Sequence, residues 1–424
     1  MHTIALSYRP DVVVAGGGTA GAAAAIAAAR AGQRVLLLEE ANALGGTSTT
    51  GGVNEWFAGL EGLGDIWAQL VGELERFGAR FGRFYNPEYT KIAWQLMAEE
   101  SGVDILFHTS VVDAAVTDAR ITQVRAVAAS HAIDIEGTVF IDATGEGDLA
   151  WLAGAETMRG HLETGRTLHM SLTFILQDTG SPVEPYLPRG LLPIETADDL
   201  PGLHGGRRLP DGRVYCNMTK VMGHDPTDPM SLSHAEREAR RQLVRILHYL
   251  QRTRFPTHAL CSSGARIGIR EGRRVVGDYV LTEADITGDR PHDFSDGVAV
   301  ATCQIDFHSL TKPGHGGWRH RVEPYAIPYR CLTARGLANL LVAGKCISGD
   351  QVAQSSYRMT PTCCAMGQAA GTAAALVVGA GGSGVRDVDL EQLRDALRKA
   401  GMELDPAKHT AFAPELSADP TRGA

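Results

Sequence analysis

The sequence has no arrangement of cysteines that could build a disulfide framework or a zinc site. Its seven cysteines are odd in number and scattered, and no two of them form a CxxC pair. Disulfide-rich secreted domains carry even sets of cysteines, and zinc sites need closely spaced ligands. We therefore expect a protein of a reducing compartment that holds no metal.

Excess positive charge and a long hydrophobic run are lacking as well. The 424 residues include 40 Lys and Arg against 49 Asp and Glu, a formal net charge of −9, which argues against a nucleic-acid partner. The start, MHTIALSYRPD, has no basic region followed by an apolar stretch, and the Ala-rich run 22–31 is too short to cross a bilayer. We expect a cytoplasmic protein without a transmembrane segment.

Glycine, in contrast, is abundant, and its first cluster lies in a βαβ unit. The 49 glycines exceed the usual share of about 7%. Residues 11–15 (DVVVA) and 34–39 (RVLLLE) are typical of buried parallel strands, and 20–32 is typical of a helix of small residues between them. This pattern predicts an α/β fold with a Rossmann-type dinucleotide-binding domain.

The turn between the first strand and the helix has the spacing of a diphosphate site. Gly16, Gly18 and Gly21 form G-x-G-x-x-G, which allows a tight turn, a close approach to a diphosphate and close helix–strand packing. Amide N–H groups and the positive end of the helix dipole would face the phosphates. Glu39, at the end of the second strand, can accept hydrogen bonds from ribose hydroxyls and would repel a 2′-phosphate.

Three further segments favour FAD over NAD. Residues 44–53 (LGGTSTTGGV) offer amides and hydroxyls to the diphosphate and ribitol, and residues 143–145 (ATG) end another apolar strand. The strand 339–343 ends at Gly344 and precedes a helix, residues 359–378, that begins near Thr362 and Cys363. A helix N-terminus stabilises negative charge on the pyrimidine edge of a reduced flavin.

The chain leaves this domain and returns to it. We expect a discontinuous FAD-binding domain formed by residues 1–55, 101–160 and 331–400. Residues 56–100 are predicted to be a helical segment, residues 161–330 an inserted α+β substrate (cap) domain, and residues 401–424 a tail. The inserted part is richer in Pro, Gly and polar residues and contains one charged helix, roughly 231–253.

These motifs resemble the glutathione-reductase-type (GR2-like) FAD superfamily and, more narrowly, its FAD-dependent oxidoreductase family. The segments that carry the resemblance are VVVAGGGTAGAAAAIAAARAG, VLLLEE, GGTSTTGGV, FIDATGEGDLAWLAGAE, REGRRVVGDYVLTEADI and NLLVAGKCISGDQVAQSSYRMTPTCCAMGQAAGTAAA. Unlike the disulfide reductases of that superfamily, residues 41–55 contain no cysteine, and a second nucleotide-binding unit is missing. This argues against a glutathione-reductase-like activity.

The resemblance implies a set of FAD-binding residues. It places the diphosphate against Gly16, Gly18, Thr19, Ala20 and Gly21, the adenosine ribose against Glu39, and the flavin diphosphate and ribitol against Gly46, Thr47 and Ser48. It further implies that Val112 meets the adenine through its backbone, that Ala143, Thr144 and Gly145 close the site, and that Gly344, Cys363 and Cys364 lie near the isoalloxazine.

Because the flavin carries the redox step, the side chains of a flavin enzyme need only orient the substrate and transfer protons. Arg270, Arg273 and Arg358 could clamp a substrate carboxylate, and His308, two residues after Asp306 on one strand face, could accept a proton. The alternatives are a salt-bridged basic stretch and a structural histidine. Tyr325, Tyr329 and Tyr357 are more often packing residues, and His169 receives little weight.

Cys363 and Cys364 offer a further alternative. A thiol at a helix start has a lowered pKa, although neighbouring cysteines are rarely catalytic. The sequence thus predicts an FAD-dependent oxidoreductase that moves a hydride between a small organic substrate and the flavin, with an unknown electron acceptor. A reductase of unsaturated bonds and a non-catalytic flavin-binding protein remain alternatives.

Overall fold

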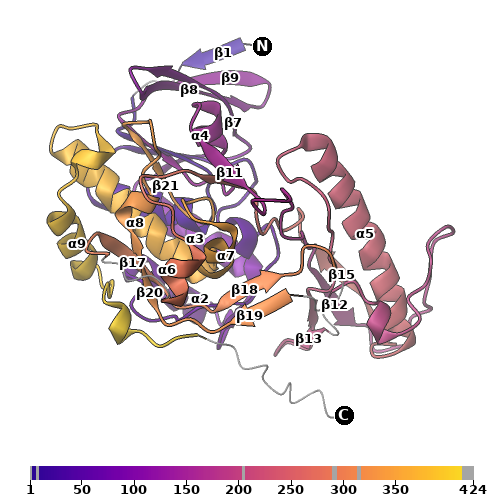
Figure 1. Ribbon diagram of the computed structural model, residues 1–424. Helices are drawn as coiled ribbons and strands as arrows, with labels where there is room; N and C mark the ends of the chain where they lie inside the picture. The colour runs from indigo at the N-terminus through magenta and orange to yellow at the C-terminus, as the bar shows by residue number, and fades with distance from the viewer. Residues whose placement is uncertain (1, 6–8, 203–205, 289–293, 313–316, 413–424) are drawn as a thin grey trace.

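A parallel sheet of five strands lies at the centre of the larger part of the molecule (Figure 1). The computed structural model describes residues 2–5, 9–202, 206–288, 294–312 and 317–412. In spatial order the strands are β21 (Leu340–Val342), β10 (Val139–Asp142), β2 (Val12–Ala15), β3 (Val35–Leu38) and β6 (Asp104–Leu106). All neighbours are parallel, and Val12 lies opposite both Val139 and Val35. The strands β2, β3 and β21 contain only buried apolar residues, as in parallel sheets covered on both faces.

Two helices of small residues, α1 (Thr19–Arg30) and α8 (Thr360–Gly379), pack against each other beside this sheet. A Cβ added at Gly367 would lie 2.1 Å from Ala20 O, and one added at Gly371 would lie 2.1 Å from Ala24 O. The two backbones can approach this closely only because glycine has no side chain. The helices α2 (Asp65–Arg76), α3 (Pro87–Glu100) and α9 (Leu390–Lys399) contact this pair.

By length and composition, α8 alone among the helices in the described residues could cross a membrane. However, 78% of its apolar window is buried inside the protein. Core helices of soluble proteins pass the same test, and the packing on α1 accounts for the apolar composition of α8.

A second sheet covers one end of the first domain. Its order is β1 (His2–Ala5), β9 (His131–Ile135), β8 (Arg120–Ala128) and β7 (Ser110–Thr117). The β7–β8 ladder pairs Val111 with Ala126 and Asp113 with Arg125, so that Val112 between them has no ladder partner. Such a bulge leaves the backbone groups of one residue outside the ladder.

The inserted part has its own antiparallel sheet and its own core. The strand order is β13 (Arg207–Arg208), β14 (Val214–Cys216), β12 (Phe174–Asp178) and β15 (His258–Ser263), and the long helix α5 (Pro229–Arg252) packs on one face. In Figure 1 this helix stands apart from the central helices, on the other side of the cap sheet. The buried apolar cluster of the cap runs from Met170 to Ile267, which is narrower than the expected range 161–330.

The remaining elements are short. Several segments expected in the cap, such as β17 (Gly297–Ala301) and β20 (Tyr325–Pro328), contribute to the core of the first domain instead. The full set of these short elements is β4 (Arg80–Phe81), β5 (Phe84–Tyr85), α4 (Asp148–Leu152), β11 (Thr157–Arg159), β16 (Arg273–Val275), α6 (Glu283–Thr287), β17 (Gly297–Ala301), β18 (Ile305–His308), β19 (Gly317–His320), β20 (Tyr325–Pro328) and α7 (Gln351–Tyr357). Short 3-10 turns lie at Gly46–Ser48, Ala197–Asp199, Tyr329–Cys331, Val385–Asp387 and Pro406–Lys408.

Candidate functional site

The three glycines of the opening turn meet three different steric demands. Gly16 has a φ of +92°, and a Cβ added there would lie 2.5 Å from Ala143 O. A Cβ added at Gly21 would lie 1.8 Å from Gly16 O, so that this glycine lets α1 pack on the turn. At Gly18, by contrast, no described atom lies within 4 Å of an added Cβ. The turn therefore has open space at the middle glycine, where the motif places a diphosphate.

The segment 44–53 lies directly against this turn. Gly45 N donates to Gly17 O at 2.8 Å, and Thr19 Oγ1 donates to Gly45 O at 3.2 Å. Buried Glu39 accepts from Gly17 N at 2.6 Å and from Ala41 N at 2.7 Å, and burial raises the pKa of its carboxyl. The residues expected around the diphosphate, Gly16 to Gly21 and Gly46 to Ser48, are thus assembled at one place.

The 143–145 turn is held by a buried carboxylate. Asp142 accepts from Thr144 N at 3.0 Å, from Thr144 Oγ1 at 2.7 Å and from Ala150 N at 2.8 Å. Burial raises the pKa of Asp142 to about 6. Lys345 Nζ donates to Gly145 O at 2.7 Å and also pairs with Glu146. The bonds of Lys345 connect the segments that follow β10 and β21.

The beginning of α8 lies beside the glycine turn and the 46–48 segment. A Cβ added at Gly344 would lie 3.1 Å from the Cβ of Ala20 on α1, and Thr360 Oγ1 accepts from Ser48 Oγ at 3.3 Å. Thr362 Oγ1 is buried and has no hydrogen-bond partner within the described ranges. An unsatisfied hydroxyl in the first turn of a helix fits a polar ligand edge at that position.

The two cysteines at this helix start are not activated thiols. Both side chains are buried, and burial raises the pKa of Cys363 to about 12 and that of Cys364 still further. The expected lowering of a thiol pKa by the helix N-terminus is wrong here, because desolvation of the thiolate outweighs the helix dipole. Cys363 and Cys364 remain wall residues of the predicted flavin site.

A second group of predicted residues meets in front of α8. His308 Nε2 lies 3.0 Å from Asp306 Oδ2, and Arg358 Nη2 donates to Asp306 O at 3.2 Å. Arg270 Nη1 donates to Ser171 Oγ at 2.8 Å and to His169 O at 3.2 Å. Nothing in the local sequence around residue 169 marks His169 as a member of this group.

The polar atoms of this group are only partly satisfied. His169 packs edge-on against His308, with ring centroids 4.6 Å apart. Both His169 Nδ1 and Arg358 Nε are buried without a hydrogen-bond partner in the part of the chain that the structure describes. Buried groups of this kind usually have a partner, so the two atoms fit a ligand or water between them.

The electrostatics of the group are dominated by positive charge. Burial first, and the charge of Arg358 second, lower the pKa of Arg270 to about 10. Burial and Arg270 also lower the pKa of Lys220. Burial lowers the pKa of His308 to about 4, although Asp306 opposes the shift, and burial holds the pKa of His169 well below its ordinary value. At neutral pH the site therefore contains charged arginines beside two uncharged imidazoles.

Other candidates lie elsewhere. Arg273 forms an ion pair with Asp148 at 2.8 Å and lies over the ring of Trp151, whereas Arg270 bonds His169 O and Ser171 Oγ. The hydroxyls of the three tyrosines are satisfied at 2.7–3.0 Å by Ser356 Oγ (Tyr325), Val385 O (Tyr329) and Ile347 O (Tyr357). Arg273 therefore does not join the other arginines, and the tyrosines are packing residues.

These features define a Rossmann-type protein with a site shaped for a flavin dinucleotide. Within the described residues, no three His, Cys, Asp or Glu side chains are grouped so as to hold a metal ion. A sequence model of the family described as FAD dependent oxidoreductase matches residues 11–397. The chain belongs to this family, it is an oxidoreductase, and FAD is its cofactor. The expected family, fold class and cofactor are confirmed.

Solved structures of similar fold share little sequence with this chain. A geranylgeranyl bacteriochlorophyll reductase-like protein from Thermoplasma acidophilum is 11% identical over 97% of this chain and 95% of its own, with a TM-score of 0.49. A triple mutant of a flavin-dependent brominase is 13% identical over 92% of this chain and 84% of its own, with a TM-score of 0.46. An anhydrotetracycline hydroxylase from Streptomyces rimosus is 13% identical over 94% of this chain and 70% of its own, also with a TM-score of 0.46. No curated protein sequence matches this chain.

Proposed function

We propose that this oxidoreductase removes a hydride from a small organic substrate that carries a carboxylate or a similar anionic group. One observation carries the proposal: Arg270, Arg358 and Lys220 bring positive charge into a buried group beside the start of α8, where the flavin is expected. Asp306 lies 3.4 Å from Arg358 and offsets one of these three positive charges. The remaining buried positive charge costs free energy unless a further anion compensates it. A substrate anion would supply that compensation, and the paired N–H donors of arginine suit a carboxylate.

The histidines supply the second requirement, a proton acceptor. A neutral His308 would donate from Nε2 to Asp306, which leaves Nδ1 as the free acceptor for a proton from the substrate. With a pKa of about 4, His308 is uncharged at neutral pH and can act as a base without first losing a proton. Bound FAD supplies the hydride acceptor, and Arg270 and Arg358 hold the substrate in reach of it.

The reductase alternative uses the same residues in the opposite direction. Reduction of an unsaturated bond needs a proton donor next to the reacting carbon, and an imidazole with a pKa of about 4 is a poor donor at neutral pH. At neutral pH His308 therefore rests in the unprotonated form, which substrate oxidation needs and reduction does not. Family membership sets the non-catalytic alternative aside, since the family is one of oxidoreductases.

The test is anaerobic reduction of the bound flavin, followed by stopped-flow absorbance. We expect 2-hydroxy or 2-amino acids to bleach the flavin, whereas the corresponding amides, which lack the negative charge, leave it oxidised. Arg358→Ala should slow bleaching roughly tenfold to hundredfold, the loss expected for one charged hydrogen bond, and His308→Gln should slow it too, with FAD still bound. Arg335→Ala is the control, because Arg335 is half-exposed and pairs only loosely with Glu156 at 3.7 Å.

Two results would contradict the proposal. Equal bleaching by acids and their amides would show that the substrate need not be an anion. Unchanged rates in both Arg358→Ala and His308→Gln would show that these residues take no part in the reaction. FAD content, measured on each variant before the reaction, separates a catalytic loss from a loss of cofactor.

A further inference from the structure

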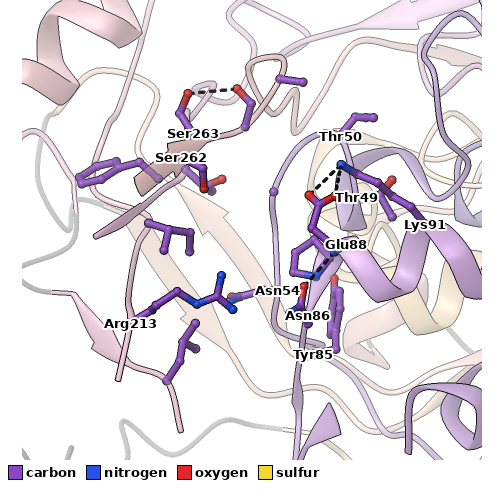
Figure 2. A pocket seen from close by; sticks show the side chains of 18 of the residues that line it. Thr49, Thr50, Asn54, Tyr85, Asn86, Glu88, Lys91, Arg213, Ser262 and Ser263 are labelled. Atoms are coloured by element: carbon purple, nitrogen blue, oxygen red, sulfur yellow. Dashed lines mark hydrogen bonds and ion pairs between the residues drawn. The ribbon is translucent and has the colours of Figure 1, made fainter. Parts of the chain in front are cut away.

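A pocket of 140 Å³ lies between the 46–54 segment, the start of α3 and the strands β12 and β15 of the cap (Figure 2). Its walls come from the segment itself (Thr49, Thr50, Asn54), from the start of α3 (Asn86, Lys91) and from the last residues of β15 (Ser262). Ser48 of the same segment bonds Thr360 at the start of α8, whereas Thr49 Oγ1 bonds Leu44 O. None of the charged or imidazole side chains of the cationic group beside α8 lines the pocket, so the two sites are distinct.

The charges that line this pocket are already paired with one another. Lys91 Nζ lies 2.8 Å from Glu88 Oε1, and Arg213 Nη2 lies 2.6 Å from Asp211 Oδ2. Figure 2 shows the Glu88–Lys91 pair and Arg213 on opposite walls. Two cations and two anions leave no net charge in the lining, so the pocket suits a neutral ligand.

The uncharged polar groups of the lining are mostly hydrogen-bond acceptors. Thr49 Oγ1 and Thr50 Oγ1 use their protons on backbone carbonyl oxygens, at 2.7 Å from Leu44 O and 3.1 Å from Gly46 O. A hydroxyl that donates its one proton in this way can only accept from a ligand. Asn54, which is 1% exposed, has an Oδ1 atom without a partner in the described ranges. A ligand with several donor hydroxyls would satisfy all three oxygens.

The size and the apolar wall of the pocket point to a ring. An engineered protein cavity of about 150 Å³ holds a benzene molecule, so 140 Å³ suits one six-membered ring. Phe81, Ile175 and Leu209 provide half-buried apolar surface for the C–H faces of such a ring. We propose that this pocket is a second small-molecule site, which binds a neutral six-membered ring bearing hydroxyl groups.

The site is coupled to the cofactor through the segment they share. Thr173 Oγ1 donates to Gly51 O at 3.1 Å, and Ala265 N donates to Thr50 O at 2.8 Å, so the cap holds the same segment on which the flavin is expected to rest. A ligand in the pocket contacts both the segment and these cap residues. Its binding should therefore alter the absorption or fluorescence of bound FAD. This inference does not depend on the nature of the oxidised substrate.

The test uses the FAD-loaded protein and two ring-shaped probes, myo-inositol and benzene, in saturation-transfer NMR titrations. We expect saturable binding of myo-inositol in preference to benzene, with a small change in flavin fluorescence. Ser262 is an exposed residue of the pocket wall, so Ser262→Trp should fill the pocket without disturbing the fold and weaken myo-inositol binding at least tenfold. Ser181→Trp, on the same domain and outside the pocket, is the matched control and should bind normally.

Three outcomes would overturn the inference. They are an absence of saturable myo-inositol binding to the FAD-loaded protein, equal binding by the Ser262→Trp variant, and tighter binding of benzene than of myo-inositol. A variant Asn54→Leu gives an independent check. If Asn54 Oδ1 accepts from the ligand, this variant should also bind at least tenfold more weakly; unchanged binding would contradict that contact.

Discussion

His308 is the residue whose chemistry depends most directly on its surroundings. Burial lowers the pKa of its imidazole to about 4. If His308 is the proton acceptor, the reaction needs the neutral form, which predominates above that pKa and is lost as pH falls through it. We expect kcat/KM to stay level on its acid side down to about pH 5 and to fall near pH 4. An acid limb near pH 6.5, the value of an unperturbed histidine, would show that burial does not act on this group.

A substitution of Asp306, the hydrogen-bond partner of His308, tests the direction of this pKa shift. Asp306 raises the pKa of His308 against the desolvation that lowers it. The Asp306→Asn variant should therefore move the acid limb to still lower pH and reduce the rate, because the amide no longer fixes the tautomer of the imidazole. A shift of the limb to higher pH in this variant would contradict the assignment.

At the same scale, only some of the candidate site could be predicted from the sequence. Asp306 and His308 are two residues apart on one strand, and period two places them on one face. His169 and Lys220 could not be predicted, because they reach His308 and Arg270 only through the tertiary structure. Arg273 lies close to Arg270 in the sequence, but it turns to Asp148. Neighbours in sequence need not share a site.

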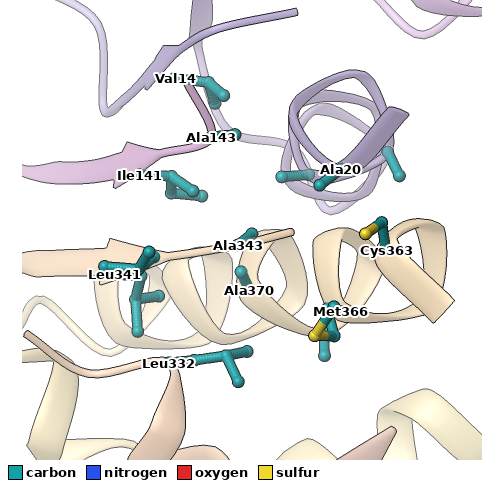
Figure 3. Packing of buried hydrophobic residues seen from close by; sticks show 14 of the residues in the cluster. Val14, Ala20, Ile141, Ala143, Leu332, Leu341, Ala343, Cys363, Met366 and Ala370 are labelled. Carbon is teal, nitrogen blue, oxygen red and sulfur yellow. The ribbon is translucent and has the colours of Figure 1, made fainter. Parts of the chain in front are cut away.

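At the scale of elements, the backbones of α1 and α8 lie in close contact. Figure 3 shows Ala20 of α1 and Cys363 of α8 facing each other across it. A methyl group added at Gly371 would lie 2.1 Å from Ala24 O. Gly371→Ala should therefore lower the free energy of unfolding by about 1–3 kcal/mol in urea titrations, because backbone cannot move aside as a flexible side chain does.

The control for this prediction lies at the C-terminal end of the same helix. A Cβ added at Gly379 meets its nearest atom, Gln33 Nε2, only at 4.0 Å. Gly379→Ala should leave stability unchanged or raise it by up to about 1 kcal/mol, the helix preference of alanine over glycine. Equal effects of the two substitutions would show that helix propensity, and not close packing, decides the role of Gly371.

The helices and strands of the first domain could be predicted from the sequence where their hydrophobic pattern is pronounced. The expected strands and helix at 11–39 and 339–343 agree closely with β2, α1, β3 and β21, because buried parallel strands have continuous apolar runs. Residues 56–100 contain two helices and the short strands β4 and β5 in place of one helical segment. Two-residue strands leave no periodicity to recognise. The short helix α7 was missed because it is only seven residues long and nearly all buried.

On the scale of the whole molecule, the cap and the first domain share the segment 46–54. The cap contributes Thr173 and Ala265 to this contact, and the first domain contributes the flavin side with Ser48 and Thr360. The domain boundaries could not be read from composition alone. Residues 294–330 are rich in short strands like the cap, but β17 and β20 bury their apolar side chains in the core of the first domain.

We propose that the opening glycine turn holds the diphosphate of FAD, and a substitution at Gly18 tests this most directly. A Cβ added at Gly18 would meet no described atom within 4 Å, so a side chain there should enter the open space of the turn, block the cofactor and spare the fold. Gly72→Val is the matched control, since an added Cβ at Gly72 on α2 also meets no described atom within 4 Å and lies outside the predicted site.

The measurement is an FAD titration of the deflavinated protein, with far-UV circular dichroism of each variant. We predict that the wild-type chain and Gly72→Val bind one FAD with equal affinity, and that Gly18→Val, equally folded, binds it at least a hundredfold more weakly. Tight FAD binding by Gly18→Val would contradict the account.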